Sequence, residues 1–171
     1  MKIANGKAAL ILICGGLFSS VSFALNIDIT GKVVASPCKV NGGDNSLDVS
    51  LGENIQANEL SAPGNSTNWI NFDLSLTNCP ASTTSFSVAF AGTADDDADY
   101  YKNTGTATNL KLQLTSQSGD KIFNNGSTLE NVLINPDTHA YTIPLRTHAV
   151  SKGLVMPGSI QGQIQATFTY Q

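Results

Sequence analysis

Charged side chains are scarce in this 171-residue sequence, where Lys, Arg, Asp and Glu together make up 13%. Acidic residues outnumber basic ones by 13 to 9, which gives a formal net charge of −4. Proteins that bind nucleic acid neutralise phosphates with clustered Lys and Arg. We therefore expect no nucleic-acid partner for this chain.

Long apolar runs are also missing, apart from one near the N-terminus. Two lysines precede an apolar run over residues 8–18, and residues 22–24 (Ser-Phe-Ala) offer small side chains at the −3 and −1 positions of a cleavage site. This order is typical of a secretory signal peptide, and the run is too short to span a bilayer as a permanent helix. We predict a signal peptide over residues 1–24. The mature chain, residues 25–171, then has no membrane span and a formal charge of −6.

Cysteine is rare, with three residues in the whole sequence. Cys14 lies in the signal, and Ile13 before it disfavours a lipoprotein anchor there. Cys38 and Cys79 remain in the mature chain, and an even number of cysteines in a secreted protein indicates a disulfide. The alternative is two buried free thiols. A bond would close a loop of about 40 residues, for which the chain-entropy model gives about 4 kcal/mol of stabilisation.

No stretch of 12 residues places its apolar residues at helical spacing. The polar residues are mostly Ser, Thr, Asn and Gln, which suit exposed faces of strands better than those of helices. Turn sequences such as Asn41-Gly42-Gly43-Asp44 separate segments in which apolar and polar residues alternate. The pattern predicts one all-β sandwich domain. The alternating segments are 27–33, 70–77, 86–90, 110–114, 141–145 and 160–170.

The N-terminal alternation precedes the first mature cysteine and places five residues on one face. Two interpretations stay open at this point. The segment is either the first strand of its own sandwich or a strand that pairs with another molecule. The five residues are Leu25, Ile27, Ile29, Gly31 and Val33.

The C-terminal strand pattern spans residues 158–171 and continues to the final residue. A strand in this position must lie inside a sheet or have its edge covered, because an open edge invites pairing with another chain.

Several motifs with a joint spacing resemble one family. Gly158 is fourteen residues from the end and Tyr170 is next to last. Cys38 closely follows the alternating N-terminal segment, and Cys79 follows about 40 residues later. Residues 100–107 (Tyr-Tyr-Lys-Asn-Thr-Gly-Thr-Ala) add a further similarity. Together these features resemble the chaperone–usher pilins, and most of all the minor FimG-type subunit of type 1 fimbriae.

The resemblance implies an incomplete immunoglobulin-like sandwich of six strands that lacks its last strand. A donor segment, residues 25–34, would precede the pilin domain, residues 35–171. A periplasmic pilus chaperone would first fill the hydrophobic groove beside the last strand. At the outer-membrane usher, the N-terminal segment of a neighbouring pilus subunit would replace it. The product would be a fimbria at the cell surface that contributes to adhesion, with this chain in a minor or adaptor position.

The resemblance also assigns roles to residues. Leu25, Ile27, Ile29 and Val33 would fill pockets of the neighbour's groove. Gly31 would face a shallow pocket, with a turn or bulge glycine as the alternative. The groove of this chain would involve the last-strand residues Gly158, Ile160, Ile164, Phe168 and Tyr170.

The other candidate groups of residues do not indicate a catalytic residue, a bound metal or a cofactor. Asp95, Asp96, Asp97 and Asp99 lack the loop glycine and terminal glutamate of an EF-hand and are interpreted as a solvated loop. His139 and His148 have no suitably spaced partners. The Gly-x-Ser-x-Gly motif, which presents the nucleophile of α/β-hydrolases, is absent. A secreted enzyme is therefore the weakest of the functional hypotheses. Trp69 is interpreted as a core or edge anchor, although it could stack on a sugar. A complete β-sandwich that binds carbohydrate is the alternative function.

Overall fold

The computed structural model describes residues 27–44 and 46–171. The predicted signal peptide and Leu25 lie outside the described residues. Residues 33–171 form one compact unit, here called the domain, and residues 27–32 are considered separately.

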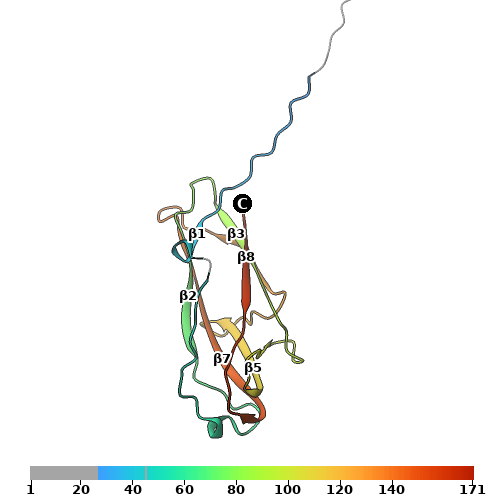
Figure 1. Cartoon of the computed structure of the whole chain (residues 1–171). Helices are drawn as coiled ribbons and strands as arrows, with labels where there is room; N and C mark the ends of the chain where they lie inside the picture. The colour runs from blue at the N-terminus through green and yellow to red at the C-terminus, as the bar shows by residue number, and fades with distance from the viewer. Residues whose placement is uncertain (1–26, 45) are drawn as a thin grey trace, which may run out of the picture. The chain divides into compact units, whose positions relative to one another are not determined.

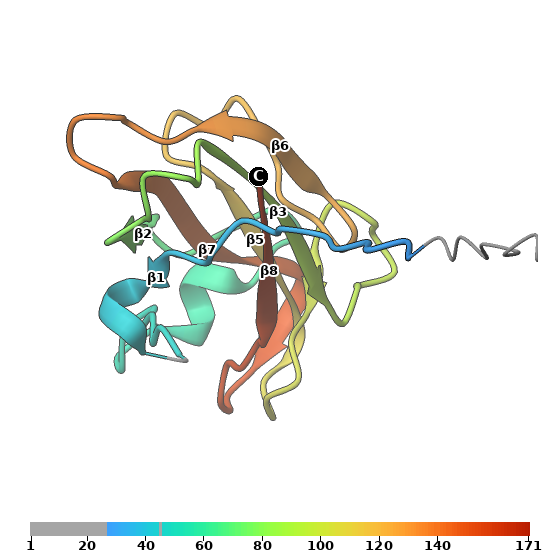
Figure 2. The ribbon, with the colours of Figure 1, turned by 90° about the horizontal axis from the view of Figure 1, so that it is seen from above.

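Two antiparallel sheets build the domain, in agreement with the all-β prediction (Figures 1 and 2). Six strands of the described chain are longer than two residues, and two short 3-10 turns, η1 (Asn41–Gly43) and η2 (Ala57–Leu60), lie between β1 and β2. The first sheet has the order β1 (Lys39–Val40), β2 (Ile70–Thr77), β7 (Tyr141–Met156), β5 (Thr108–Ser116) and β4 (Tyr101–Lys102). The second has the order β6 (Thr128–Leu133), β3 (Ser85–Gly92) and β8 (Ile164–Tyr170).

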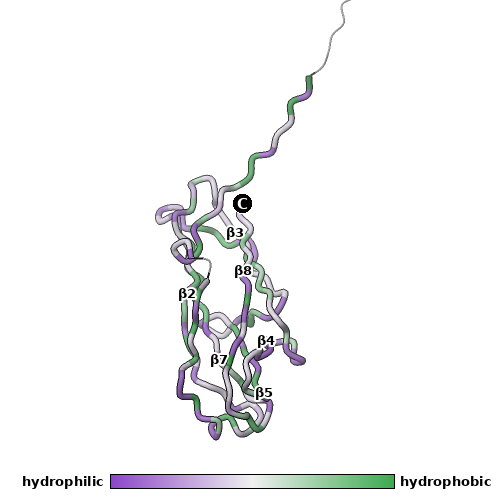
Figure 3. Tube along the Cα trace, in the orientation of Figure 1, coloured by the Kyte–Doolittle hydropathy of each residue, from purple (hydrophilic) through white to green (hydrophobic). Residues whose placement is uncertain are grey.

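The core lies between the inner faces of the two sheets. Successive side chains of a strand point to opposite faces, so alternating apolar residues line one side. Along β3, for example, Phe86, Val88 and Phe90 are at most 2% exposed. Hydropathy changes from residue to residue along these strands (Figure 3). The first sheet contributes the inward residues Leu74, Leu76, Leu110, Leu112, Leu114, Ile143 and Leu145.

The predicted disulfide joins Cys38 to Cys79. Cys38 stands just before β1 and Cys79 just after β2, and both side chains are buried. The backbone N–H of Cys79 also donates to the carbonyl of His139, 3.0 Å away. The bond therefore fixes the start of the domain to the end of its second strand.

Candidate functional site: a groove beside β8

One edge of β8 has no strand beside it within the described part of the chain. β8 pairs with β3, from Phe86↔Tyr170 to Gly92↔Ile164. Ser85 and Gln171 exchange backbone hydrogen bonds of 3.2 and 3.0 Å, which marks them as a hydrogen-bonded pair. Such pairs alternate along an antiparallel ladder. The backbone N–H and C=O groups that point to the other edge are therefore those of Ile164, Ala166, Phe168 and Tyr170.

These four β8 residues also carry the inward side chains, yet all four are only half-buried. Phe168 packs on Phe86 with ring centroids 5.9 Å apart, and Tyr170 stacks on Phe168 at 6.2 Å. Burial raises the pKa of the Tyr170 phenol, although the Cys38 backbone opposes this shift. The inner face of β8 is therefore packed on its β3 side and open on the other.

A groove of about 1770 Å³ lies along this open side and is called the β8 groove below. Its lining comes from β8 and the segment before it, from inward faces of the first sheet, and from residues 40–60. Polar residues contribute to this lining alongside apolar side chains that pack against the core. The apolar side chains include Leu51, Ile55, Leu60, Phe72, Leu74, Phe90, Leu112, Leu145, Ile160, Ile164 and Phe168.

The segment before β8 differs from the sequence-based expectation. The last strand was expected from residue 158, but β8 begins at Ile164. Residues 159–161 instead hydrogen-bond to the loop that follows β4. Ala107 donates to the Ser159 carbonyl at 3.0 Å, and the Gln161 N–H donates to Asn103 Oδ1 at 2.8 Å. The side-chain oxygen of Asn103 thus takes the place of a backbone acceptor for Gln161. This interrupts the regular strand-type hydrogen bonding before β8. Gly158 and Ile160 lie outside β8 but still line the groove.

The remaining predicted site residues lie in the N-terminal segment. Residues 27–38 contain no strand. Ile27, Ile29 and Val33 are 77%, 91% and 99% exposed. A Cβ at Gly31 would meet nothing within 4 Å. A row of exposed apolar side chains with strand periodicity thus precedes a domain that has an open strand edge.

The N-terminal segment leaves the domain at the end where β8 finishes. Thr83 Oγ1 donates to the Ser36 carbonyl at 2.7 Å, and the Thr84 N–H donates to the Gln171 carbonyl at 2.8 Å. We call this the exit end of the domain.

Residues 47–60 contribute to the groove and were missed by the sequence reasoning. Leu51 and Ile55 are half-buried against the core, and Leu60 is 2% exposed. A signal was present, because Leu47, Val49 and Leu51 alternate with polar residues. Residues 47–51 form no strand. The alternation therefore marks an apolar face of the segment and does not indicate backbone pairing with a neighbouring strand.

Trp69 and His148 take part in packing on the first sheet. The Trp69 ring stacks on His148, with centroids 3.5 Å apart and planes 16° apart. The Arg146 guanidinium carbon lies 4.2 Å from the Trp69 ring centroid. His148 Nε2 lies 3.2 Å from Gln113 Oε1. Trp69 therefore anchors the start of β2 against β7, as the anchor interpretation proposed.

The acidic loop is held by two ion pairs. Asp95 is buried and bonds to Lys152 at 2.8 Å, while Asp97 bonds to Lys111 at 2.7 Å. Asp96 and Asp99 are exposed. Asp96 and Asp99 therefore face solvent, as expected for this loop, whereas Asp95 forms a structural ion pair with Lys152.

The fold is similar to that of pilus subunits of known structure. The P pilus rod subunit PapA superposes with a TM-score of 0.63 at 18% identity, over 85% of this chain and 100% of that one. The P pilus adaptor subunit PapF gives a TM-score of 0.53 at 14% identity, over 82% and 100%.

Sequence comparison defines the family more closely. The family model described as fimbrial protein matches residues 27–171. The S-fimbrial adhesin protein SfaS of Escherichia coli O6:K15:H31 (strain 536 / UPEC) is 34% identical over 96% of this chain and 99% of its own length. Protein FimG of Escherichia coli (strain K12) is 36% identical over 85% and 84%. The chain belongs to the fimbrial protein family, which confirms the resemblance to pilins.

Within the described residues, no helix is long and apolar enough to cross a membrane.

Proposed function

We propose that this chain is a structural pilus subunit that polymerises by donor-strand exchange. Residues 25–34 of one subunit fill the β8 groove of the subunit before it. The observation that carries the proposal is the unpaired edge of β8, with the open groove beside it. This is β-strand addition, in which backbone hydrogen bonds give affinity and side-chain pockets give specificity.

The spacing of the two partners supports this pairing. Alternate residues of a strand lie about 6.8 Å apart. Ile27 and Ile29 have this spacing in the donor segment, and Ile164, Ala166 and Phe168 have it along the groove. Burying one such side chain is worth about 1.5–3 kcal/mol. Leu25, Ile27, Ile29 and Val33 together give about 6–12 kcal/mol as an upper bound, before the cost of ordering.

The open groove also supports a proposal for the partners. A periplasmic chaperone covers it first, and at the outer-membrane usher the donor segment of the next subunit replaces the chaperone strand. A better-fitting strand drives this exchange, so no chemical energy source is required. The completed fibre is kinetically stable, because separation would expose the groove again.

The position within the pilus is that of a minor, adaptor-type subunit. Residues 100–107 resemble minor subunits, and the similarity to FimG extends over most of the chain. A relative named as an adhesin, SfaS, supports a role of the assembled fibre in adhesion. The chain acts through assembly and not as an enzyme.

The proposal is tested by completing the sandwich in one molecule. The chain without residues 25–34 is compared with the same chain carrying residues 25–34 on a flexible linker after Gln171. We expect a large rise in melting temperature with the appended strand. The matched control strand carries Ile27→Asp and Ile29→Asp and should give little or no rise. Equal melting temperatures for all three proteins, with the truncated chain already stable and monomeric, would show a closed domain and exclude donor-strand exchange.

A further inference from the structure

The charged residues that line the β8 groove all have the same sign. Asp44, Asp48 and Glu53 belong to its lining, whereas no Lys, Arg or His occurs among the described residues that line it. We call these three residues the acidic wall. A segment that lies in the groove therefore meets three carboxylates and no cation.

The acidic wall belongs to one side of the groove. All three residues come from the segment 44–53 and are exposed. Val49 and Leu51 of the same segment are half-buried against the core, so the segment turns apolar side chains inward and keeps Asp48 at the solvent. β8 adds no charge to the groove. Its outward residues are Gln165, Thr167 and Thr169.

None of the three carboxylates forms an ion pair with a described residue. The ion pairs of the domain join Lys111 to Asp97 and Lys152 to Asp95, in the acidic loop before β4. Lys39, just before the segment, is not paired with the acidic wall either. Surface charges act over about 8 Å at physiological ionic strength. A cation placed beside this wall is therefore stabilised, and a further carboxylate is repelled.

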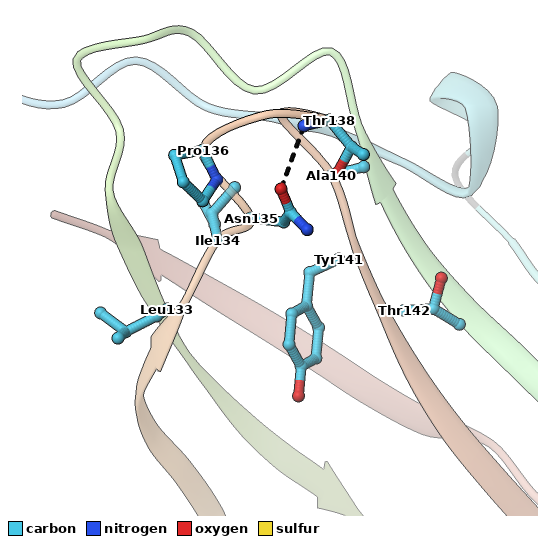
Figure 4. Close-up of a pocket in the computed structure, with 8 residues that line it drawn as sticks. All are labelled: Leu133, Ile134, Asn135, Pro136, Thr138, Ala140, Tyr141 and Thr142. Atoms are coloured by element: carbon cyan, nitrogen blue, oxygen red, sulfur yellow. Dashed lines mark hydrogen bonds between the residues drawn. The ribbon is translucent and has the colours of Figure 1, made fainter.

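A second concave surface shows that a lining of one sign is not common to every hollow of this domain. The pocket among residues 133–142 has a volume of about 490 Å³ and is lined by uncharged residues only (Figure 4). Asn135 Oδ1 holds the turn that frames it, by accepting the N–H groups of Asp137 at 2.9 Å and Thr138 at 3.1 Å. The acidic lining thus distinguishes the β8 groove, where a donor segment would lie.

The donor segment of this chain does not complement the acidic wall. Its apolar face has the spacing of the groove, but its polar face carries Asp28 and Lys32, whose charges cancel. A second copy would therefore bring one more carboxylate, that of Asp28, to a groove that already holds three. A segment with Lys or Arg on its polar face would instead place opposite charges side by side, which favours the correct partner over others.

We propose that the acidic wall selects the N-terminal donor segment of a different pilus subunit, one whose polar face carries a net positive charge. The inference rests on the proposed function and deepens it, because it names the chemistry of the neighbour. Apolar side chains supply the affinity for the groove, and the repulsion of Asp28 disfavours a second copy. Such a choice suits an adaptor-type subunit, whose two neighbours differ.

The selection is tested on the full mature chain with an additional donor strand appended on a flexible linker after Gln171. The strands are residues 25–34 unchanged, with Asp28→Asn and with Asp28→Lys. Melting temperatures should rise in this order, with the Asp28→Lys strand about 2–4 °C above the unchanged one. Thr30→Lys moves the cation to the next position of the polar face and should also raise the melting temperature. These gains should shrink in about 1 M salt, where charges are screened within about 3 Å.

The matched change in the domain removes the charge of the acidic wall. Asp44→Asn, Asp48→Asn and Glu53→Gln keep the size of three exposed side chains, so the fold should persist. The gain from Asp28→Lys should then disappear, and the double-mutant cycle isolates the interaction between strand and wall. Glu59→Gln is the control, because this residue is exposed but does not line the groove. It should leave the gain intact.

Three outcomes separate the two proposals. Greater stabilisation by the Lys-containing strands, lost with the neutral wall, supports the selection. Equal melting temperatures for the unchanged and Lys-containing strands, or an equal gain with the neutral wall, overturn the selection and leave donor-strand exchange intact. If no strand stabilises a chain that is already stable and monomeric, the proposed function fails, and the selection fails with it.

Discussion

Gly158 lies against the backbone of Thr106 so closely that a Cβ atom at position 158 would be 2.6 Å from the Thr106 carbonyl carbon. Two hydrogen bonds hold this approach. The Ser159 N–H donates to Thr106 Oγ1 at 2.8 Å, and the Thr106 N–H donates to Ser159 Oγ at 3.0 Å. Close backbone approach is a reason for a chain to use glycine. The glycine fourteen residues from the end thus seats the segment that lines the start of the β8 groove.

Gly158→Ala should therefore destabilise the domain by about 1–3 kcal/mol, because the added methyl group must push two backbone segments apart. Urea denaturation of the full mature chain with an additional donor strand appended after Gln171 measures this change. Gly31→Ala, in the native N-terminal segment, is the matched control, since its Cβ meets nothing within 4 Å. Equal stability of Gly158→Ala and the unmodified chain would contradict the close packing.

Replacing Ile27 and Ile29 with Asp should abolish insertion of this subunit into the preceding one. Chaperone binding should persist, because the proposed chaperone site is the β8 groove and not residues 25–34. Incorporation into fibres and co-purification with the chaperone measure the two effects. Thr30→Asp adds a charge on the other face of the segment and should be incorporated. Normal incorporation of the double variant would refute the donor role.

Cys38→Ser should lower the free energy of unfolding by about 4 kcal/mol, because the disulfide closes a loop with a sequence separation of 41. The yield of folded subunit should fall sharply. Cys38→Ser/Cys79→Ser should show a similar loss, which separates the missing bond from the effect of a free thiol. An unchanged denaturation midpoint in both variants would mean that the disulfide does not stabilise the domain.

Acid should weaken the packing around His148. Burial lowers the pKa of His148 from its ordinary value of about 6.5, and the charge of Arg146 acts in the same direction, while the Thr67 backbone opposes it. The unfolded chain therefore binds the proton more readily. This contribution to stability is complete above about pH 6.5 and is lost as pH falls through the lower, folded-state pKa.

The pH effect is measured from urea midpoints at pH 7.5 and at pH 5 for the unmodified chain and for His148→Gln. The unmodified chain should lose more stability between these two values than the variant does. All other titrating groups are common to both proteins, so an identical loss would show that His148 does not contribute.

Period-two alternation was sufficient to locate the strands whose two faces differ in environment. The segment 70–77 became β2 with the predicted bounds, and the 110–114 pattern lies within β5. Alternation of apolar and polar residues does not identify a strand whose two faces are both covered. Only residues 141–145 of the 16-residue β7 were predicted, because further along Trp69 covers the outer face at His148. β6 was missed because its ladder shifts register opposite Phe86 and Val88.

The groove could be predicted only in part. Ile164 and Phe168 followed from the alternation and the family resemblance and line the β8 groove, whereas Tyr170, also expected there, packs against the core outside the groove lining. The contribution of residues 47–60 depends on contacts distant in sequence, which local pattern does not encode. The same is true of Asn103, whose side chain interrupts the ladder before β8.

The Cys38–Cys79 bond has a mechanical consequence for a fibre held by donor strands. A pulling force on the N-terminal segment reaches the domain at Cys38 and can pass through the covalent bond to Cys79, at the end of β2. β2 pairs with β7 from Ile70 to Leu76, so the tension spreads over seven paired positions. The two-residue strand β1 and the groove-lining residues 40–60 are bypassed. Stretching the fibre would thus load the sheet that forms one wall of the groove and spare the wall formed by residues 40–60.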